Sequence, residues 1–289
     1  MAEVTVHTLK VPGAVLTYDI RQGPDTDAPP LLLIGSPMGA AGFGSLAKHF
    51  TDRTIVTYDP RGSERSTKPD MTSPSTPDDH ADDLHRIIQQ LGRGPVDLFA
   101  SSGGAVNALA LVAKHPEDVR VLVAHEPPIA SALSDRENAL AACRAVHETY
   151  MRSGFGAGMA HFIAVVSHHG EFPAEYARRP APDPAMFGMP TEDDGNRTDP
   201  LMGQNMVSST HYEPNYETLR KASTKIVLAA GVESEGILPS RAAYAVADLL
   251  GTKVQVFPSG HGGFLGGEYG QTGEPNAFAA KLHEALQEA

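Results

Sequence analysis

The chain has 289 residues, of which 41% are hydrophobic and 20% are charged, as in an ordinary globular protein with a sizeable core. Its net charge of −12 argues against non-specific binding to nucleic acid or to anionic membranes. Cys143 is the only cysteine, which excludes an internal disulfide and a cysteine-based zinc site.

The sequence contains no pattern typical of a membrane-spanning or secreted protein. No apolar run reaches the roughly 18–20 residues that span a bilayer. The first seven residues, Met-Ala-Glu-Val-Thr-Val-His, lack the charged and apolar regions of a signal peptide. We therefore expect a cytoplasmic protein that acts on a small molecule, with no nucleic-acid or membrane partner, and we leave a homodimer open.

The first predicted elements are strands. Polar and apolar residues alternate over 4–10 and 14–21, and many of them are β-branched. Pro12-Gly13 lies between the two segments, so they are predicted to form a hairpin. Residues 31–34 form a continuous apolar run, which is typical of a strand buried on both faces of a parallel sheet. The next strand is expected at residues 54–58.

Helices and strands then alternate. A helix is predicted from Pro77 to residue 91, because Thr76 can cap it and Gly92 can end it. The later elements are a strand at 96–99, a helix at 104–114, strands at 119–124 and 226–230, a helix at 239–250, a strand at 254–257 and a helix at 275–287. This alternation predicts an α/β fold with a mainly parallel central sheet flanked by helices.

The alternation stops between residues 129 and 223. The pattern there is helical from Leu133 to about Met151 and then rich in Pro, Gly and Met. We predict a core formed by residues 1–128 and 224–289, and a partly helical cap insertion over 129–223. The methionines of this insertion either pack an irregular cap or form an adaptable apolar roof over a pocket.

A candidate nucleophile follows the strand at 96–99. That strand runs into Ala-Ser-Ser-Gly-Gly at 100–104 and then into a helix, the layout of a nucleophile elbow. The residues two before and two after the nucleophile must be small. Ala100 and Gly104 satisfy this for Ser102, whereas Phe99 would be too large if Ser101 were the nucleophile. Ser102 is therefore the candidate, and a simple Gly/Ser turn is the alternative.

Three other segments strengthen this interpretation. Asp-Pro-Arg-Gly-Ser-Glu-Arg-Ser at 59–66 resembles the Asp-x-Arg-Gly-x-Gly-x-Ser loop of the α/β-hydrolase fold family, with Glu64 in place of the second Gly. Leu-Ile-Gly-Ser-Pro at 33–37 resembles that family's His-Gly-x-Pro turn, with Ile34 in place of His. Pro-Ser-Gly-His-Gly at 258–262 resembles its Gly-x-Gly-His turn. Their order along the chain extends the resemblance over nearly the whole sequence.

Chemistry explains why these residue types would converge. A serine hydroxyl needs a base to accept its proton, and an imidazole with a pKa near 6.5 is suited to that task. His261 directly follows a late core strand, where ligands gather in a parallel sheet. His261 is therefore the candidate base, and a loop histidine flanked by glycines is the alternative.

The developing oxyanion needs backbone N–H donors. One donor should be Gly103, which follows the nucleophile at a helix N-terminus. The other should come from the loop after residues 31–34. Pro37 has no N–H, so Ser36 is the natural supplier, and the family resemblance points to the same position.

The acid that would orient His261 is less evident. In most of the family an Asp lies three residues after the glycine that ends the next-to-last strand, and counting from Gly231 gives Ser234. Glu233 and Glu235 flank that position. The alternative is Glu126, after the strand at 119–124, where the haloalkane dehalogenase group places its acid. We favour Glu126, because two prolines follow it and stiffen its backbone; a structural role at the strand end is the alternative.

Three cofactor or metal interpretations are set aside. Gly-Phe-Gly-Ser-Leu-Ala at 42–47 matches the loose dinucleotide fingerprint but begins eight residues after the strand instead of directly after it. No Gly-Lys-Ser/Thr follows a glycine cluster, which excludes a P-loop. His80, His85, His161 and His168-His169 lack metal-site spacing. We expect neither a cofactor nor a metal.

The resemblance implies a serine hydrolase. It would cleave an ester, lactone or thioester of a small to medium, largely apolar compound through an acyl-enzyme on Ser102. The same residues could serve a carbon–carbon bond hydrolase or a cofactor-free perhydrolase. A hypothesis from another class is a non-catalytic ligand-binding receptor on the same fold.

Overall fold

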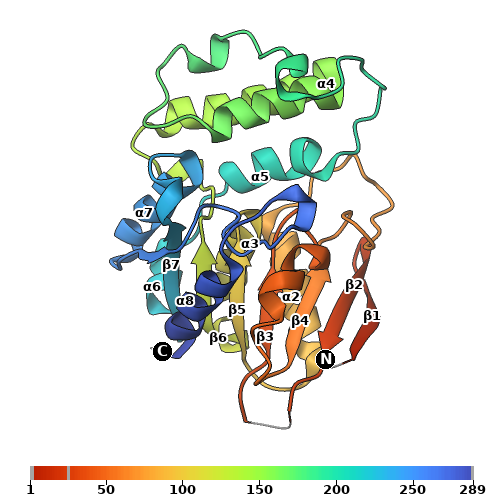
Figure 1. The fold of residues 1–289 in the computed structure, drawn as a ribbon, viewed down its shortest axis with the longest axis vertical. Coiled ribbons are helices and arrows are strands. Elements are labelled where there is room, and N and C mark those ends of the chain that lie inside the picture. Colours follow the sequence, from red (N-terminus) through yellow and green to blue (C-terminus); the bar gives the residue numbers. More distant parts are fainter. Residues whose placement is uncertain (1–2, 25–26, 288–289) are drawn as a thin grey trace.

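A computed structural model describes residues 3–24 and 27–287 (Figure 1). The extreme ends of the predicted core, and the first two residues of the segment searched for a signal peptide, lie outside this range. The described residues contain an eight-stranded sheet in the order β1-β2-β4-β3-β5-β6-β7-β8. β1 and β2 form an antiparallel hairpin, β2 pairs antiparallel with β4, and the remaining neighbours are parallel. The predicted mainly parallel sheet is confirmed.

The strands lie close to their predicted positions. They are β1 (Val4–Val11), β2 (Ala14–Arg21), β3 (Leu31–Ile34), β4 (Ile55–Asp59), β5 (Val96–Ser101), β6 (Val119–His125), β7 (Lys225–Gly231) and β8 (Gln255–Phe257). The largest differences are at carboxyl ends, where β5 continues two residues beyond the prediction.

The α-helices are α1 (Gly44–Ala47), α2 (Pro77–Leu91), α3 (Gly103–Lys114), α4 (Arg136–Val166), α5 (Met206–Thr210), α6 (Tyr216–Lys221), α7 (Leu238–Leu250) and α8 (Pro275–Gln287). Short 3-10 turns are η1 (Ala40–Phe43), η2 (Pro116–Asp118), η3 (Ala130–Ala132), η4 (Tyr176–Arg178), η5 (Pro184–Phe187), η7 (Val232–Ser234) and η8 (Glu268–Gly270), and η6 (Leu201–Asn205) is a π-helical turn. No helix within the described ranges is both long and apolar enough to cross a membrane.

The central strands are buried on both faces, as their apolar runs predict. In β3, Leu32 and Ile34 pack in one core with α2 and α3, whereas Leu31 and Leu33 pack in the opposite core with α1 and α8. Burying one such side chain contributes about 1.5–3 kcal/mol. Helices on both faces therefore hold the strands firmly, and with them the loops at their carboxyl ends.

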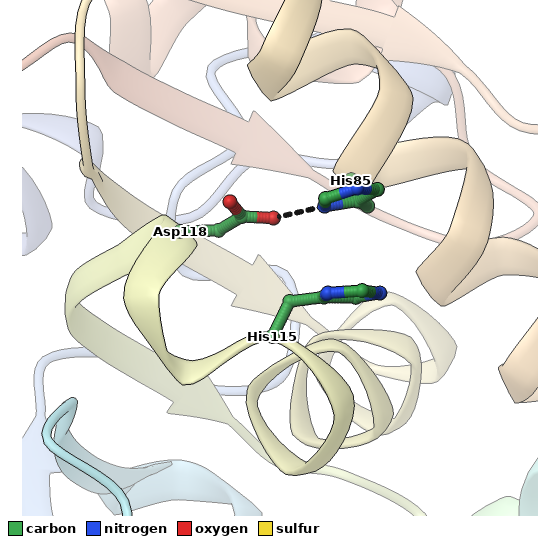
Figure 2. Close-up of side chains that lie close together, drawn as sticks. All are labelled: His85, His115 and Asp118. Carbon is green, nitrogen blue, oxygen red and sulfur yellow. Dashed lines mark hydrogen bonds and ion pairs between the residues drawn. The ribbon is translucent and has the colours of Figure 1, made fainter.

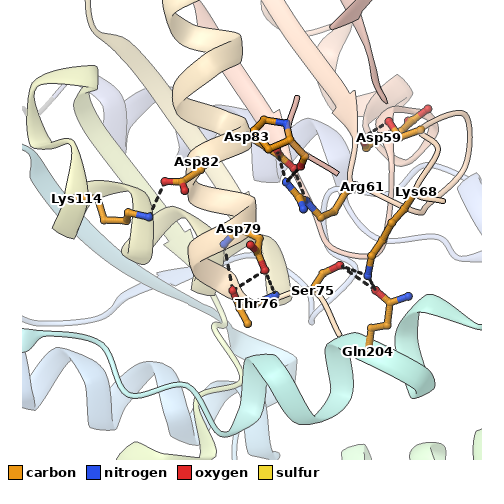
Figure 3. A network of polar contacts seen from close by, with 12 residues as sticks. Asp59, Arg61, Lys68, Ser75, Thr76, Asp79, Asp82, Asp83, Lys114 and Gln204 are labelled. Carbon is orange, nitrogen blue, oxygen red and sulfur yellow. Dashed lines mark hydrogen bonds and ion pairs between the residues drawn. The ribbon is translucent and has the colours of Figure 1, made fainter. Parts of the chain in front are cut away.

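The start of α2 follows from its sequence. The Thr76 hydroxyl accepts a hydrogen bond from the Asp79 N–H, and the Asp79 carboxylate accepts one from the Thr76 N–H (Figure 3). Pro77 takes the first helical position, where its missing N–H costs nothing. Gly92 ends the helix with a φ of +64°, a conformation that favours glycine.

A buried ion pair fixes the loop at 59–66. Arg61 donates two hydrogen bonds of 2.7 Å to the carboxylate of Asp83 on α2, and both side chains are buried (Figure 3). Arg65, in the same loop, is paired with Asp59 and Asp19. The two parallel hydrogen bonds between Arg61 and Asp83 fix the orientation of the guanidinium group as well as its distance from the carboxylate. The loop is thereby held against β2, β4 and α2.

Most of the segment between β6 and β7 lies over one end of the sheet, with α4 above α5 in the view of Figure 1. The predicted helix from Leu133 to about Met151 corresponds to the first part of α4, which begins at Arg136 and is interrupted at Gly154. Its glycines resemble helix breakers in the sequence. Gly154 interrupts the helix with a φ of +81°, and the second part folds back onto the first, since the Thr149 hydroxyl lies 3.0 Å from His161 Nδ1. The absence of a side chain at Gly156 permits close packing against Pro190, whose carbonyl oxygen would collide with a Cβ at this position.

His80 on α2 makes the stability of the fold pH-dependent. Its ring is buried, and neither ring nitrogen has a hydrogen-bond partner within the described part of the chain. Burial, together with the charge of Arg61, lowers the pKa of His80 to about 3. Between pH 6.5 and 3 the unfolded state therefore binds a proton that the folded state does not. Stability must fall as the pH decreases through this range.

We predict that His80→Phe makes the free energy of unfolding less dependent on pH. Between pH 6.5 and 4.5 the slope should decrease by roughly 1 kcal/mol per pH unit, measured by urea unfolding. The control is His49→Phe at an exposed position, which should leave the slope unchanged. Equal slopes for wild type and His80→Phe would contradict the assignment.

Candidate active site

Ser102 occupies the tight turn between β5 and α3. Its φ of +57° and ψ of −129° are rare for a residue with a side chain, and such strain persists only where the surroundings enforce it. The Ser102 N–H donates to the His125 carbonyl at 3.0 Å. A Cβ at Gly104 would lie 2.8 Å from the backbone of Gly35. The turn therefore requires a very small residue two positions after Ser102.

The loop after β3 lies directly against the start of α3. A Cβ at Gly103 would lie 2.5 Å from the Ser36 carbonyl oxygen. Gly103 is the first residue of α3, so its N–H has no acceptor within the helix. Ser36 is buried, and its hydroxyl donates to Asn205 at 3.3 Å. The two residues predicted to supply oxyanion donors are thus neighbours beside Ser102.

His261 is hydrogen-bonded to Glu126, with 2.5 Å between Nδ1 and Oε2. The other Glu126 oxygen accepts the Gly231 N–H at 2.8 Å. Glu126 is fully buried and has a φ of +49°. Burial by itself would raise the pKa of Glu126, but the hydrogen bond from His261, the electrostatic influence of the two neighbouring imidazoles and the Gly231 N–H oppose it and lower that pKa to about 2. The carboxylate is ionised at neutral pH.

The two other carboxylates considered for this role lie elsewhere. Glu233 accepts a hydrogen bond of 3.2 Å from the Ser259 hydroxyl. Glu235 is exposed and lines a groove beside α7. Neither bonds to His261 within the described residues. Ser234, the position that carries an Asp in most of the family, is buried and offers no carboxylate.

Ser102 and His261 line the same cavity of about 400 Å³. No hydrogen bond joins their side chains in the described part of the structure. The segment between β6 and β7 contributes Phe162, Pro200 and Leu201 to the wall. These residues could not be predicted from the sequence, because their contacts with the rest of the cavity join distant parts of the chain. A larger groove of about 1030 Å³ beside α7 contains neither Ser102 nor His261, so the smaller cavity is the candidate site.

His125 is a buried neighbour of the site that was not predicted from the sequence. Its Nδ1 lies 3.3 Å from the Ser101 hydroxyl, and its ring centroid lies 6.1 Å from that of His261. Burial lowers the pKa of His125 to about 4, although the charge of Glu126 opposes this. His125 is therefore neutral near pH 7. Its place at the end of β6, directly before Glu126, was the available signal.

One cluster outside the cavity could hold a metal by residue type. His85, His115 and Asp118 bring their ligand atoms within 4.8 Å of one another (Figure 2). However, the two imidazoles are stacked, with centroids 3.8 Å apart and an interplanar angle of 13°. Their in-plane lone pairs then run nearly parallel and do not converge. The His85 Nδ1 lies 2.6 Å from Asp118, so hydrogen bonding accounts for this arrangement.

Known proteins resemble the chain over most of its length. Residues 29–268 match the family of the alpha/beta hydrolase fold. An uncharacterized hydrolase, YraK, of Bacillus subtilis is 29% identical over 286 residues, covering 97% of this chain and 95% of that protein. A 2-(acetamidomethylene)succinate hydrolase of Mesorhizobium japonicum is 34% identical over 112 residues, 38% of each chain.

Solved structures share the fold at low sequence identity. A thermophilic esterase from Thermogutta terrifontis superimposes with a TM-score of 0.66 at 19% identity, covering 99% of both chains. An enol-lactonase from Burkholderia xenovorans gives a TM-score of 0.66 at 15% identity, covering 97% of this chain and 100% of that one.

The close approach at Gly103 gives a prediction about stability. We expect Gly103→Ala to lower the free energy of unfolding by about 1–3 kcal/mol, because the new methyl group must displace the loop at Ser36. Gly203→Ala is the control, since its nearest neighbouring atom lies at an ordinary 3.5 Å, and it should change stability by less. Denaturant unfolding measures both, and equal effects would contradict the predicted contact.

Proposed function

Because the chain belongs to the alpha/beta hydrolase fold family, we propose that it is a serine hydrolase with Ser102 as nucleophile, His261 as base and Glu126 as acid. It cleaves an ester, lactone or thioester of a small to medium, largely apolar compound. The observation that carries this proposal is the 2.5 Å hydrogen bond from His261 to the buried Glu126, beside the cavity that Ser102 lines.

The proposed reaction begins with proton transfer. Glu126 binds the Nδ1–H of His261 and thereby leaves Nε2 unprotonated, so this nitrogen can accept the Ser102 proton. The serine oxygen attacks the substrate carbonyl. The negative charge that develops on the carbonyl oxygen is met by the N–H groups of Gly103 and Ser36, and each such donor typically contributes about 2.7–4 kcal/mol.

The second half of the reaction releases both products. His261 returns its proton to the leaving group as the tetrahedral intermediate collapses to an acyl-enzyme on Ser102. Water then attacks the acyl carbon, with His261 accepting one of its protons, and the acid is released as the Ser102 hydroxyl reforms. Catalytic hydrogen bonds often tighten only when substrate is bound, which is consistent with the absence of a Ser102–His261 bond in the free protein.

The cavity supports the proposed substrate size and polarity. A volume of about 400 Å³ lies at the lower end of the range for small-molecule sites, about 300–1,000 Å³. Met38, Phe162, Leu201 and Phe264 give it apolar walls. Burying an apolar acyl or alcohol group against these walls would supply most of the binding free energy.

We predict that a fluorophosphonate probe labels the wild-type protein and fails to label Ser102→Ala. The probe reports an activated serine directly, without knowledge of the natural substrate. Circular dichroism should show that the variant is folded. No labelling of either protein would favour the ligand-binding receptor over the enzyme.

A second prediction concerns the acid. Glu126→Gln should lower kcat for a p-nitrophenyl ester by about 10²–10⁴-fold, because a neutral amide neither fixes the imidazole tautomer nor stabilises its positive charge. Glu235→Gln, at an exposed carboxylate, is the matched control and should retain wild-type kcat. Near-normal turnover of Glu126→Gln would overturn the assignment.

A further inference from the structure

The cavity at Ser102 contains one acidic side chain and no lysine or arginine. Its lining includes the carboxylate-bearing Glu64, and His261 is the only other titratable side chain there apart from Tyr269. Glu64 lies in the loop at 59–66, at the position where the resembling family motif has glycine. Its φ of +48° is the conformation that favours glycine. The chain thus carries a carboxylate at the cavity rim despite an unfavourable backbone conformation.

Tyr269 meets Glu64 across this rim. The Tyr269 hydroxyl donates a hydrogen bond of 3.4 Å to Glu64 Oε1. Tyr269 also has a positive φ, +53°, so two strained residues from distant parts of the sequence meet at the cavity. Strained conformations of this kind cluster at ligand-binding and catalytic sites.

The carboxylate of Glu64 has no cationic partner within the described residues. The neighbouring Arg65 is engaged with Asp59 and Asp19. Lys68 is directed to Ser73, Ser75 and Gln204. The cations nearest to Glu64 in sequence are therefore already paired or hydrogen-bonded, and the rim keeps its negative charge.

The titration of Tyr269 agrees with a negative potential at the rim. Burial raises the pKa of Tyr269, and the negative charges of Glu64, Asp59 and Glu268 raise it further, to about 12. The same potential would repel an anionic substrate and attract a cationic one.

Aromatic side chains lie in the same cavity as the Glu64 carboxylate. Tyr269, Phe162 and Phe264 line the same cavity as Glu64. A carboxylate combined with aromatic rings is the arrangement that recognises an ammonium group, through charge attraction and cation–π contact. We propose that Glu64 is a specificity-determining residue that receives a positively charged amine of the substrate. This inference rests on the proposed function and narrows its substrate class to esters that carry an ammonium group.

The test compares three p-nitrophenyl esters that differ in charge. They are the esters of γ-trimethylammoniobutyric acid, of its uncharged tert-butyl isostere, and of glutaric acid, which leaves a free carboxylate. In wild type we expect kcat/KM for the ammonium ester to exceed that of the isostere by about fivefold to tenfold, and the glutarate ester to fall below it by a similar factor. Both ratios should approach one as salt is added.

Two substitutions remove the charge of Glu64. Glu64→Gln keeps the shape of the side chain, and Glu64→Gly restores the residue that suits the backbone and should be at least as stable as wild type. In both variants the ratio of ammonium ester to isostere should fall to within twofold of one. Glu235→Gln removes one negative charge elsewhere on the surface and should preserve the wild-type ratio.

The outcomes separate this inference from the proposed function. If wild type hydrolyses the three esters with equal kcat/KM, or if Glu64→Gln and Glu235→Gln reduce the ratio equally, the role of Glu64 is overturned while the serine hydrolase stands. If wild type hydrolyses none of them and the fluorophosphonate probe labels nothing, the proposed function itself fails. A lost preference in both Glu64 variants, with the control unchanged, supports the inference.

Discussion

The candidate site depends on one buried contact, the hydrogen bond between Glu126 and His261. A lone carboxylate inside a protein is costly, and this one is stabilised by two donors, His261 on one oxygen and the Gly231 N–H on the other. The second donor comes from the end of β7, so pairing of neighbouring strands keeps the acid in place. Removing His261 would leave a buried charge with one partner fewer. The orientation of the His261 imidazole therefore depends on the pairing of β6 and β7 at their carboxyl ends.

Backbone strain is concentrated around this contact. The non-glycine residues with positive φ in the described structure are Glu64, Ser102, Glu126, Ser259 and Tyr269. Ser102, Glu64 and Tyr269 line the cavity, Glu126 holds His261, and Ser259 lies two residues before His261. Each such conformation costs on the order of 1–3 kcal/mol. The two apolar cores on either face of the sheet stabilise the strands enough to hold these turns, which places the unfavourable conformations where side chains must be aimed with precision.

Local steric rules explain how much could be predicted from the sequence. The buried strands, the cap of α2 at Thr76 and the small residues around Ser102 follow from nearest neighbours in the chain, and the structure has each of them. The partner of His261 does not follow in this way. Glu126 and Glu233 come after adjacent parallel strands whose ends meet at one edge, and only the register of β6 on β7, with His125 opposite Ala229, decides which carboxylate reaches the imidazole. The return of the second part of α4 onto the first was not predicted for a similar reason, since it rests on contacts between residues far apart along the chain, such as Thr149 and His161.

The loop at 59–66 departs from the family motif at one position, Glu64, to which we assign substrate recognition. Asp59, Arg61 and Arg65 use their charges to fix the loop, through the pairs with Asp83 and Asp19. None of these three side chains lines the cavity. They hold the loop in place but do not contact a ligand in the cavity. Glu64 is the exception, because its side chain lies on the cavity side of the same rigid loop. A glycine at this position would add no charge to the rim of the cavity, whereas Glu64 adds a carboxylate to the cavity that Ser102 also lines. The proposed recognition of a substrate cation then accounts for the unfavourable backbone conformation of Glu64.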